Sequence, residues 1–196
     1  VHRLDEICVR NAFLTSGGIP PDKLLFVNLS PQTLDIDAGD GAWLPETSLV
    51  PKRARGQIVI EVTERFGGRM VPVMKRLLAL KEEGFKIALD DIGTGNSGLE
   101  MMGRIEADFI KIDRSIVNGA EKQASARAVL TAMALFAEQT GTFVIAEGIE
   151  DAEMLQYIQS LAEPEMGMPT VVHGGQGYGL GRPSVEVALD PVWPLD

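Results

Sequence analysis

The sequence is poor in the features that mark secreted and membrane proteins. It contains a single cysteine, Cys8, in 196 residues, which excludes an internal disulfide and a cysteine-based metal cluster. It has no run of about 18 uncharged apolar residues, the length that a transmembrane helix needs, because even its richest stretch, residues 124–137, contains Arg127. Its first residues lack the apolar core of a signal peptide. We therefore expect a reducing, cytoplasmic environment.

Basic residues are also scarce. The chain has 18 lysines and arginines against 28 aspartates and glutamates, a formal net charge of −10 at pH 7. It shows no basic stripe interleaved with aromatic residues, which excludes a nucleic-acid polymer as its partner. A phosphate-bearing substrate would then need a divalent cation to bridge its phosphate to these carboxylates. The length, with 45% hydrophobic and 23% charged residues, is typical of one soluble globular domain.

Short apolar runs alternate with segments of helical period. The runs are residues 24–27, 58–60, 86–89, 109–112 and 143–146. Helices are predicted near residues 4–11, over 70–81 before Gly84, over 129–137 before Gly141, and over 154–161 after a capping Asp151. Residues 35–57 and 163–175 are predicted to be irregular. Continuous apolar strands alternating with helices predict an α/β fold with a parallel sheet.

Polar side chains follow each apolar run at the point where the chain leaves it. They are Asn28, Glu61 with Glu64, Asp90 with Asp91, Asp113, and Glu147 with Glu150, and Gln176 lies in a last short segment. Successive members are roughly one strand–helix unit apart, so each is expected at the carboxyl end of a parallel strand. In a barrel or an open α/β sheet, that end is the functional face.

So many carboxylates on one face need positive counter-charges. Oxygen-rich clusters suit Mg²⁺, Mn²⁺ or Ca²⁺, and a carboxylate that bridges two cations about 3.5–4 Å apart is usual in phosphodiester hydrolysis. Asp90 and Asp91 would both reach such a site if the strand bends there. Lys111 lies inside an apolar run, so its ammonium must be paired, and it is a candidate to orient water or offset phosphoryl charge.

Simpler interpretations exist for each residue alone. A single acidic residue at a strand end is usually a helix cap or a solvated loop group, and Asp113 fits a cap. Glu64 and Arg65 fit a weak surface ion pair, and residues 91–95 fit a plain glycine turn. The recurrence of the same role in five units favours a common site over these separate explanations.

Six segments resemble, in order, the motif set of EAL domains, a family of bacterial cyclic di-GMP phosphodiesterases. They are LFVNLS (25–30), EVTE (61–64), DDIGTG (90–95), FIKID (109–113), AEGIE (146–150) and QGY with GRP (176–183). The resemblance covers about residues 4–187. It implies a modified TIM (β/α)8-type barrel, N-terminally incomplete, and metal-dependent hydrolysis of cyclic di-GMP to linear pGpG, a reaction of bacterial second-messenger signalling.

The resemblance also implies roles for individual residues. The metal ligands would be Asn28, Glu61, Asp90, Asp91 and Glu147, with two Mg²⁺ or Mn²⁺ ions as cofactors. Lys111 and Glu147 would act on the attacking water, and Glu64 would steady the loop after Asp91. Asp113, Glu150 and Gln176 would line the substrate site.

The chain departs from the family pattern in two ways. The Glu-Ala-Leu motif, expected some tens of residues before Val1, is absent, so residues 1–196 are expected to form a single domain without its first strand and helix. Ile92, Asn96 and Gly98 stand where the family often has Phe, Tyr and Ser, in the loop 92–99 that helps form the family dimer. A homodimer through this loop and an upstream sensor or GGDEF-type domain are the expected protein partners.

Two other functions are compatible with the residues. A non-catalytic cyclic di-GMP receptor would bind the nucleotide without metal-dependent turnover. A TIM-barrel lyase or isomerase would use one Mg²⁺ with Lys111 as the base, but it leaves Asp91 without a role. For these residues alone, the missing glutamate predicts weak or no turnover.

Overall fold

The computed structural model describes residues 2–20, 22–35, 55–63, 70–93, 98–162 and 172–184. The chain divides into two compact units. The first consists of Val1–Leu89 and Gly95–Ala107, and the second of Asp90–Thr94 and Asp108–Asp196. None of the described helices is long and apolar enough to cross a membrane.

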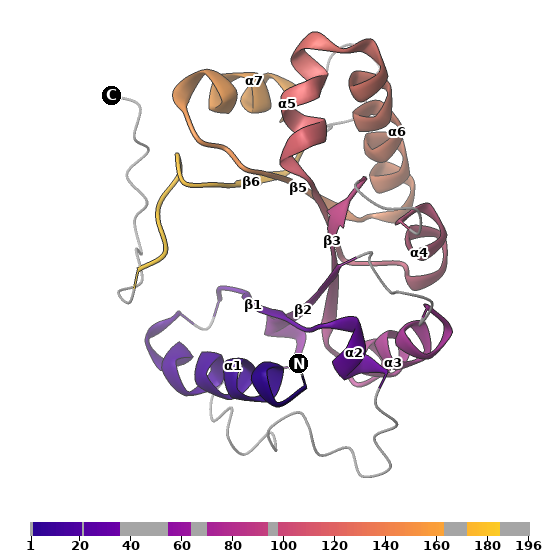
Figure 1. Cartoon of the computed structure of the whole chain (residues 1–196), viewed down its shortest axis with the longest axis vertical. Helices are drawn as coiled ribbons and strands as arrows, with labels where there is room; N and C mark the ends of the chain where they lie inside the picture. Colours follow the sequence, from indigo (N-terminus) through magenta and orange to yellow (C-terminus); the bar gives the residue numbers. More distant parts are fainter. Residues whose placement is uncertain are drawn as a thin grey trace. The chain divides into compact units, whose positions relative to one another are not determined.

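Parallel strands alternate with helices along the described chain (Figure 1). The strands are β1 (Leu25–Asn28), β2 (Ile58–Thr63), β3 (Lys86–Ile92), β4 (Phe109–Ile112), β5 (Phe143–Glu147) and β6 (Gly174–Gln176). Their order in the sheet is the order of the sequence. β1 pairs with β2, β4 with β5, and β5 with β6, all in parallel. These pairings confirm the α/β class predicted from the alternation of apolar runs and helical segments.

The first unit contains four helices and the first two strands. Its helices are α1 (His2–Thr15), α2 (Pro31–Leu34), α3 (Met70–Glu82) and α4 (Gly98–Ile105), with 3-10 turns η1 (Ser16–Gly18) and η3 (Arg55–Gln57). α3 buries Val73, Leu77 and Leu80, as its period predicts. It ends at Glu82, and Gly84 closes it from just beyond that end: its φ is 95°, and its N–H donates to the Lys81 carbonyl.

The second unit contains β4 to β6 and three helices, α5 (Arg114–Lys122), α6 (Ala124–Thr140) and α7 (Ala152–Ala162). Gly141 caps the C-terminus of α6; it has a φ of 71° and donates its N–H to the Ala137 carbonyl. Asp151 caps the start of α7, and its Oδ1 accepts a hydrogen bond from the Met154 N–H at 2.8 Å. Both helix ends confirm the predicted capping residues.

The strands extend further than their apolar runs. β1, β2 and β5 include the polar residues Asn28, Glu61 and Glu147, and β3 includes Asp90 and Asp91. These residues stay in the ladder because backbone pairing does not depend on side-chain polarity; Asn28 pairs with Glu61, for example. Of the two segments predicted to be irregular, residues 36–54 and 163–171 lie outside the described residues.

A carboxylate joins α1 to the turn after β1 in the first unit. Asp5 Oδ2 accepts hydrogen bonds from the Ser30 N–H at 2.9 Å, the Ser30 hydroxyl at 2.6 Å and the Thr33 hydroxyl at 2.5 Å. Burial alone would raise the pKa of Asp5, but the hydrogen bonds from Ser30 and Thr33 outweigh it and hold the pKa below its usual value. Ser30 also caps α2, so Asp5 fixes that helix start from outside.

We predict that Asp5→Ala lowers the free energy of unfolding by about 1.5–3 kcal/mol at pH 7, because hydrogen bonds to a charged group contribute on that order. The folded-state pKa lies below the unfolded one, so this stabilisation is present above the unfolded pKa of about 3.9 and is lost as the pH falls through the folded pKa. Urea unfolding followed by circular dichroism at pH 7 and below about pH 3 tests both statements.

The matched control is Asp22→Asn, because Asp22 forms an exposed ion pair with Lys23 and such pairs contribute little. An Asp5→Ala protein whose urea midpoint differs from wild type by the same amount at both pH values would contradict the role of the ionised carboxylate.

Candidate metal centre

Three carboxylates of the second unit converge at strand ends. Asp90 and Asp91 are in the last part of β3, and Glu147 is the last residue of β5. One oxygen from each lies within 4.8 Å of the others, and all three residues are half-buried. Parallel strands end on the same side of a sheet, so the predicted gathering of these side chains is confirmed for this unit.

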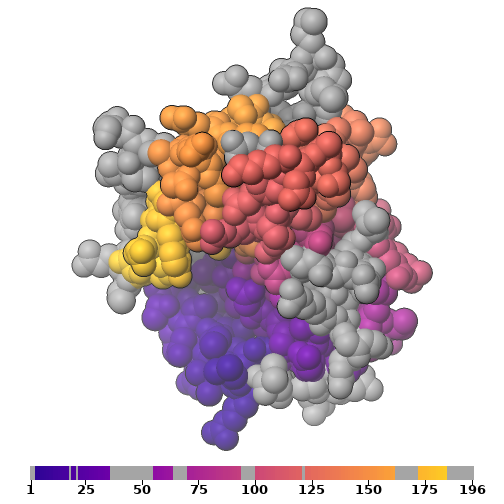
Figure 2. All heavy atoms as spheres, turned by 45° about the horizontal axis from the view of Figure 1, so that its top comes forward, coloured from indigo at the N-terminus to yellow at the C-terminus, as the bar shows by residue number. Residues whose placement is uncertain are grey.

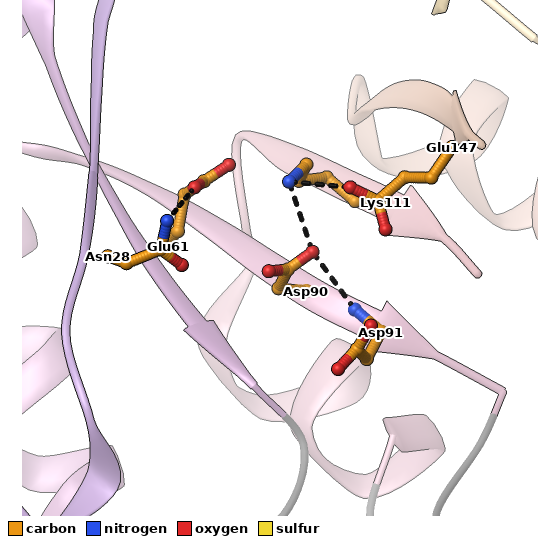
Figure 3. A network of polar contacts seen from close by, with 6 residues as sticks. All are labelled: Asn28, Glu61, Asp90, Asp91, Lys111 and Glu147. Carbon is orange, nitrogen blue, oxygen red and sulfur yellow. Dashed lines mark hydrogen bonds and ion pairs between the residues drawn. The ribbon is translucent and has the colours of Figure 1, made fainter. Parts of the chain in front are cut away.

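Lys111 lies among these carboxylates (Figure 3). It is in the middle of β4, and the residue is only 3% exposed. Its Nζ is 3.1 Å from Asp90 Oδ1 and 2.7 Å from Glu147 Oε1. A buried ammonium needs such partners to offset its lost hydration. The expectation that Lys111 is paired is therefore confirmed.

One ammonium does not neutralise the cluster. Burial raises the pKa of Glu147; the hydrogen bond and charge of Lys111 oppose that rise, and the negative charges of Asp90 and Asp91 add to it. Three ionised carboxylates and one ammonium leave an excess of negative charge. All the donor atoms are oxygens, which Mg²⁺, Mn²⁺ and Ca²⁺ prefer. The residues therefore fit divalent cations.

The backbone turns sharply at Asp91. Its φ is 57°, in the left-handed region, which costs a non-glycine residue roughly 1–2 kcal/mol, and its N–H donates to Asp90 Oδ1 at 3.1 Å. This bend lets two adjacent residues of one strand reach the same cluster. Gly93 follows with a φ of 104°, and a Cβ there would lie 2.0 Å from Ile116 Cδ1. The glycine is therefore required by the path of the turn.

The first unit holds a separate polar pair. The Asn28 side-chain amide donates to Glu61 Oε2 at 2.8 Å (Figure 3). The two residues are cross-strand partners at the carboxyl ends of β1 and β2, and Glu61 is buried. Both groups offer oxygens to a cation, as expected, but their role as metal ligands stays a prediction.

The residues predicted to contact substrate line one cavity of the second unit. This cavity has a volume of about 290 Å³ and is lined by Asp113, Arg114, Glu147, Gly148, Glu150, Gln176, Gly177 and Tyr178. Gln176 pairs with Glu147 across β5 and β6. Asp113 also caps α5, since its Oδ1 accepts the Ser115 N–H at 2.8 Å. The cap interpretation is correct for Asp113 and does not remove it from the cavity.

Arg114 and Tyr178, which also line this cavity, were not predicted as site residues from the sequence. Arg114 forms an ion pair with Glu150, and the Arg182 guanidinium lies 5.0 Å from the centre of the Tyr178 ring. Arg114 adjoins the predicted Asp113, but its partner is 36 residues away, so no local pattern indicates the pair. Glu64 and residues 94–97, which include part of the predicted dimer loop, lie outside the described residues.

Comparisons with known proteins identify similar chains. The EAL domain family model matches residues 1–183. The chain is 28% identical over 180 residues to the probable cyclic di-GMP phosphodiesterase PdeN of Escherichia coli, covering 92% of this chain and 33% of PdeN. It is 28% identical over 188 residues to MucR of Pseudomonas aeruginosa, a bifunctional diguanylate cyclase/cyclic di-GMP phosphodiesterase, covering 92% of this chain and 25% of MucR.

A solved structure extends the comparison to the fold. BlrP1 of Klebsiella pneumoniae, in complex with manganese and cyclic di-GMP, superposes with a TM-score of 0.77 at 30% identity, over 93% of this chain and 45% of that one. This similarity confirms the predicted fold class, an incomplete α/β barrel of the modified TIM type. The alignments to the two curated relatives cover only a third of PdeN and a quarter of MucR, so the chain spans a third or less of their length.

We predict that Lys111→Met lowers the free energy of unfolding by about 3 kcal/mol in EDTA, because Asp90 and Glu147 lose the buried partner that offsets their charges. In millimolar Mn²⁺ the loss should shrink, since a bound cation replaces the missing positive charge. Urea unfolding in EDTA and in Mn²⁺ measures both effects.

The control is Lys75→Met, which removes an exposed lysine of α3. It should leave the free energy of unfolding unchanged in both EDTA and Mn²⁺. Equal losses for Lys111→Met in EDTA and in Mn²⁺ would contradict cation binding at this cluster. No loss in either condition would contradict the structural role of the buried ammonium.

Proposed function

We propose that this chain, which belongs to the EAL domain family, is a metal-dependent phosphodiesterase that hydrolyses cyclic di-GMP to linear pGpG. The observation that carries the proposal is the cluster of Asp90, Asp91 and Glu147 around the buried Lys111. It adjoins a cavity through Glu147, which belongs to both. The names of PdeN and MucR support the same activity.

Divalent cations are the cofactors of this proposal. Asp90, Asp91 and Glu147 would hold them, and the family resemblance adds Asn28 and Glu61 to the ligand set. The manganese in the BlrP1 complex supports such a cofactor, and two Mg²⁺ or Mn²⁺ ions are proposed here. When bound, these ions supply positive charge that stabilises the phosphoryl oxygens and lowers the pKa of water.

The side chains have separate parts in the reaction. The Lys111 ammonium has three N–H donors, two of which face Asp90 and Glu147; it is proposed to orient the attacking water. Glu147, with its raised pKa, is the carboxylate proposed to accept a proton from that water. As water attacks phosphorus the P–O3′ bond breaks and O3′ takes up a proton from solvent, which leaves a 5′-phosphate and a 3′-hydroxyl on pGpG.

Substrate recognition is assigned to the cavity. Asp113 and Glu150 offer carboxylates that accept hydrogen bonds from base N–H groups, and Gln176 offers both a donor and an acceptor. Glu64 is proposed, from the resemblance alone, to steady the loop that follows Asp91. A homodimer through loop 92–99 and an attached sensor or GGDEF-type domain remain part of the proposal; the bifunctional name of MucR supports the latter.

Neither competing function explains the cluster as well. A receptor has no need of a buried lysine between carboxylates. A lyase that uses one cation leaves Asp91 unused, yet Asp91 is one of the three carboxylates within 4.8 Å of one another. A left-handed backbone at a non-glycine residue, such as that of Asp91, is common at functional sites.

We predict that Asp90→Asn lowers pGpG formation from cyclic di-GMP in Mn²⁺ by more than about 100-fold, the upper end of the loss that outer-sphere changes cause. The assay is chromatographic, in the natural full-length protein that contains this chain. Glu138→Gln, an exposed change on α6, is the control and should retain wild-type turnover.

Two outcomes would contradict the proposal. Wild-type protein that binds cyclic di-GMP at micromolar concentration without forming pGpG would be a receptor. Wild-type protein that neither binds nor hydrolyses the nucleotide would have lost both functions of the family.

A further inference from the structure

One ion pair of the second unit borders two cavities. Arg114 and Glu150 line the cavity that also contains Gln176 and Tyr178. They also line a second cavity of about 290 Å³ between α5 and α7, with Asn118, Lys122, Asp151 and Tyr157 among its other residues. The two helices lie next to each other on the surface of this unit (Figures 1 and 2). The Arg114 guanidinium therefore stands at the edge of the proposed substrate cavity.

The stem of Arg114 is held in place by a glycine. A Cβ added to Gly148 would lie 2.6, 2.7 and 2.8 Å from Cβ, Cγ and Cδ of Arg114, so the absence of a side chain there makes room for the arginine. Gly148 directly follows Glu147 of the carboxylate cluster. The arginine stem thus lies along the backbone beside the cluster, and its guanidinium reaches Glu150.

The pair offers two kinds of hydrogen bond at one place. Arg114 Nη1 donates to Glu150 Oε1, and a guanidinium has five N–H donors in a planar fork. The Arg114 side chain is 51% exposed and that of Glu150 45%, so both remain accessible to a ligand. A fork of donors beside a carboxylate acceptor matches a ligand edge that carries acceptors beside donors.

Guanine has such an edge. Its O6 and N7 are adjacent acceptors that an arginine contacts with two parallel hydrogen bonds, and its N1–H and N2–H donors suit a carboxylate. Adenine has an amino donor in place of O6, so an arginine that faces this position would meet a donor with a donor. The pair therefore has the chemistry to distinguish the two purines.

We propose that Arg114 is the specificity-determining residue for guanine in this cavity, and that it reads O6 and N7 while Glu150 accepts from the N–H edge. This inference rests on the proposed function, because it takes cyclic di-GMP as the substrate. Arg114 is not a catalytic residue in this proposal, since it contacts the base and not the reacting phosphate.

The experiment compares Arg114→Met with Arg104→Met in the natural full-length protein. Arg104 of α4 forms an ion pair with Glu100 that is similarly exposed, at 60% and 47% of the two side chains, so it controls for the loss of a surface arginine. Exposed pairs of this kind contribute little to stability, and circular dichroism verifies that both variants fold.

Arg114→Met should raise the KM for cyclic di-GMP about 10- to 100-fold, the range of one bidentate arginine–guanine contact, with little change in kcat or in the Mn²⁺ concentration needed. The inhibition constant of cyclic di-AMP should stay unchanged, so discrimination between the two nucleotides narrows by the same factor. The KM of Arg114→Lys for cyclic di-GMP should lie between those of wild type and Arg114→Met, because a lysine keeps the charge but lacks the planar fork of donors.

Three results would overturn the inference. An Arg114→Met enzyme with the KM of Arg104→Met would show that Arg114 does not contact substrate. Equal weakening of cyclic di-GMP and cyclic di-AMP would assign Arg114 to a phosphate instead of a base. In both cases wild-type turnover leaves the proposed function intact. Wild-type protein without cyclic di-GMP binding or turnover would remove the proposed function and this inference together.

Discussion

The candidate site of the second unit depends on the burial of one positive charge. Lys111 is flanked in β4 by Ile110 and Ile112, both fully buried, so its ammonium cannot reach bulk water without leaving the core. Its partners Asp90 and Glu147 must therefore stand at their own strand ends. This requirement sets the mutual position of three strands at these ends. The charge of Lys111 also opposes the rise that burial gives to the pKa of Glu147.

The same arrangement leaves the site with too many negative charges. Asp91 brings a third carboxylate to a place where Lys111 already serves two, and it does so through a left-handed backbone. Without a cation, neither the third carboxylate nor the left-handed backbone of Asp91 stabilises the chain. The surrounding strands supply the rigidity, since Ala88, Leu89 and Ala146 are fully buried. In the proposed function, a divalent cation would offset this repulsion and would gain binding energy from it.

The sequence predicts those features whose chemistry is local. Continuous apolar runs mark parallel strands because both strand faces are covered, and Gly84, Gly141 and Asp151 mark helix ends because few residues adopt those conformations or accept those hydrogen bonds. The last residue of each strand was harder to predict, because a polar residue such as Asn28 can continue the hydrogen-bonded ladder. The Arg114–Glu150 pair was missed because tertiary packing over 36 residues of separation creates it.

A residue of this chain can cap a helix and also line a functional cavity. In a strand–helix unit the residue that ends a strand is also close to the start of the next helix, so one side chain serves both places. Asp113 caps α5 and lines the first cavity, and Asp151 caps α7 and lines the second. A cap assigned from sequence is therefore no argument against function at the carboxyl end of a parallel strand. The useful question is whether the same residue also faces a cavity, which only the fold can answer.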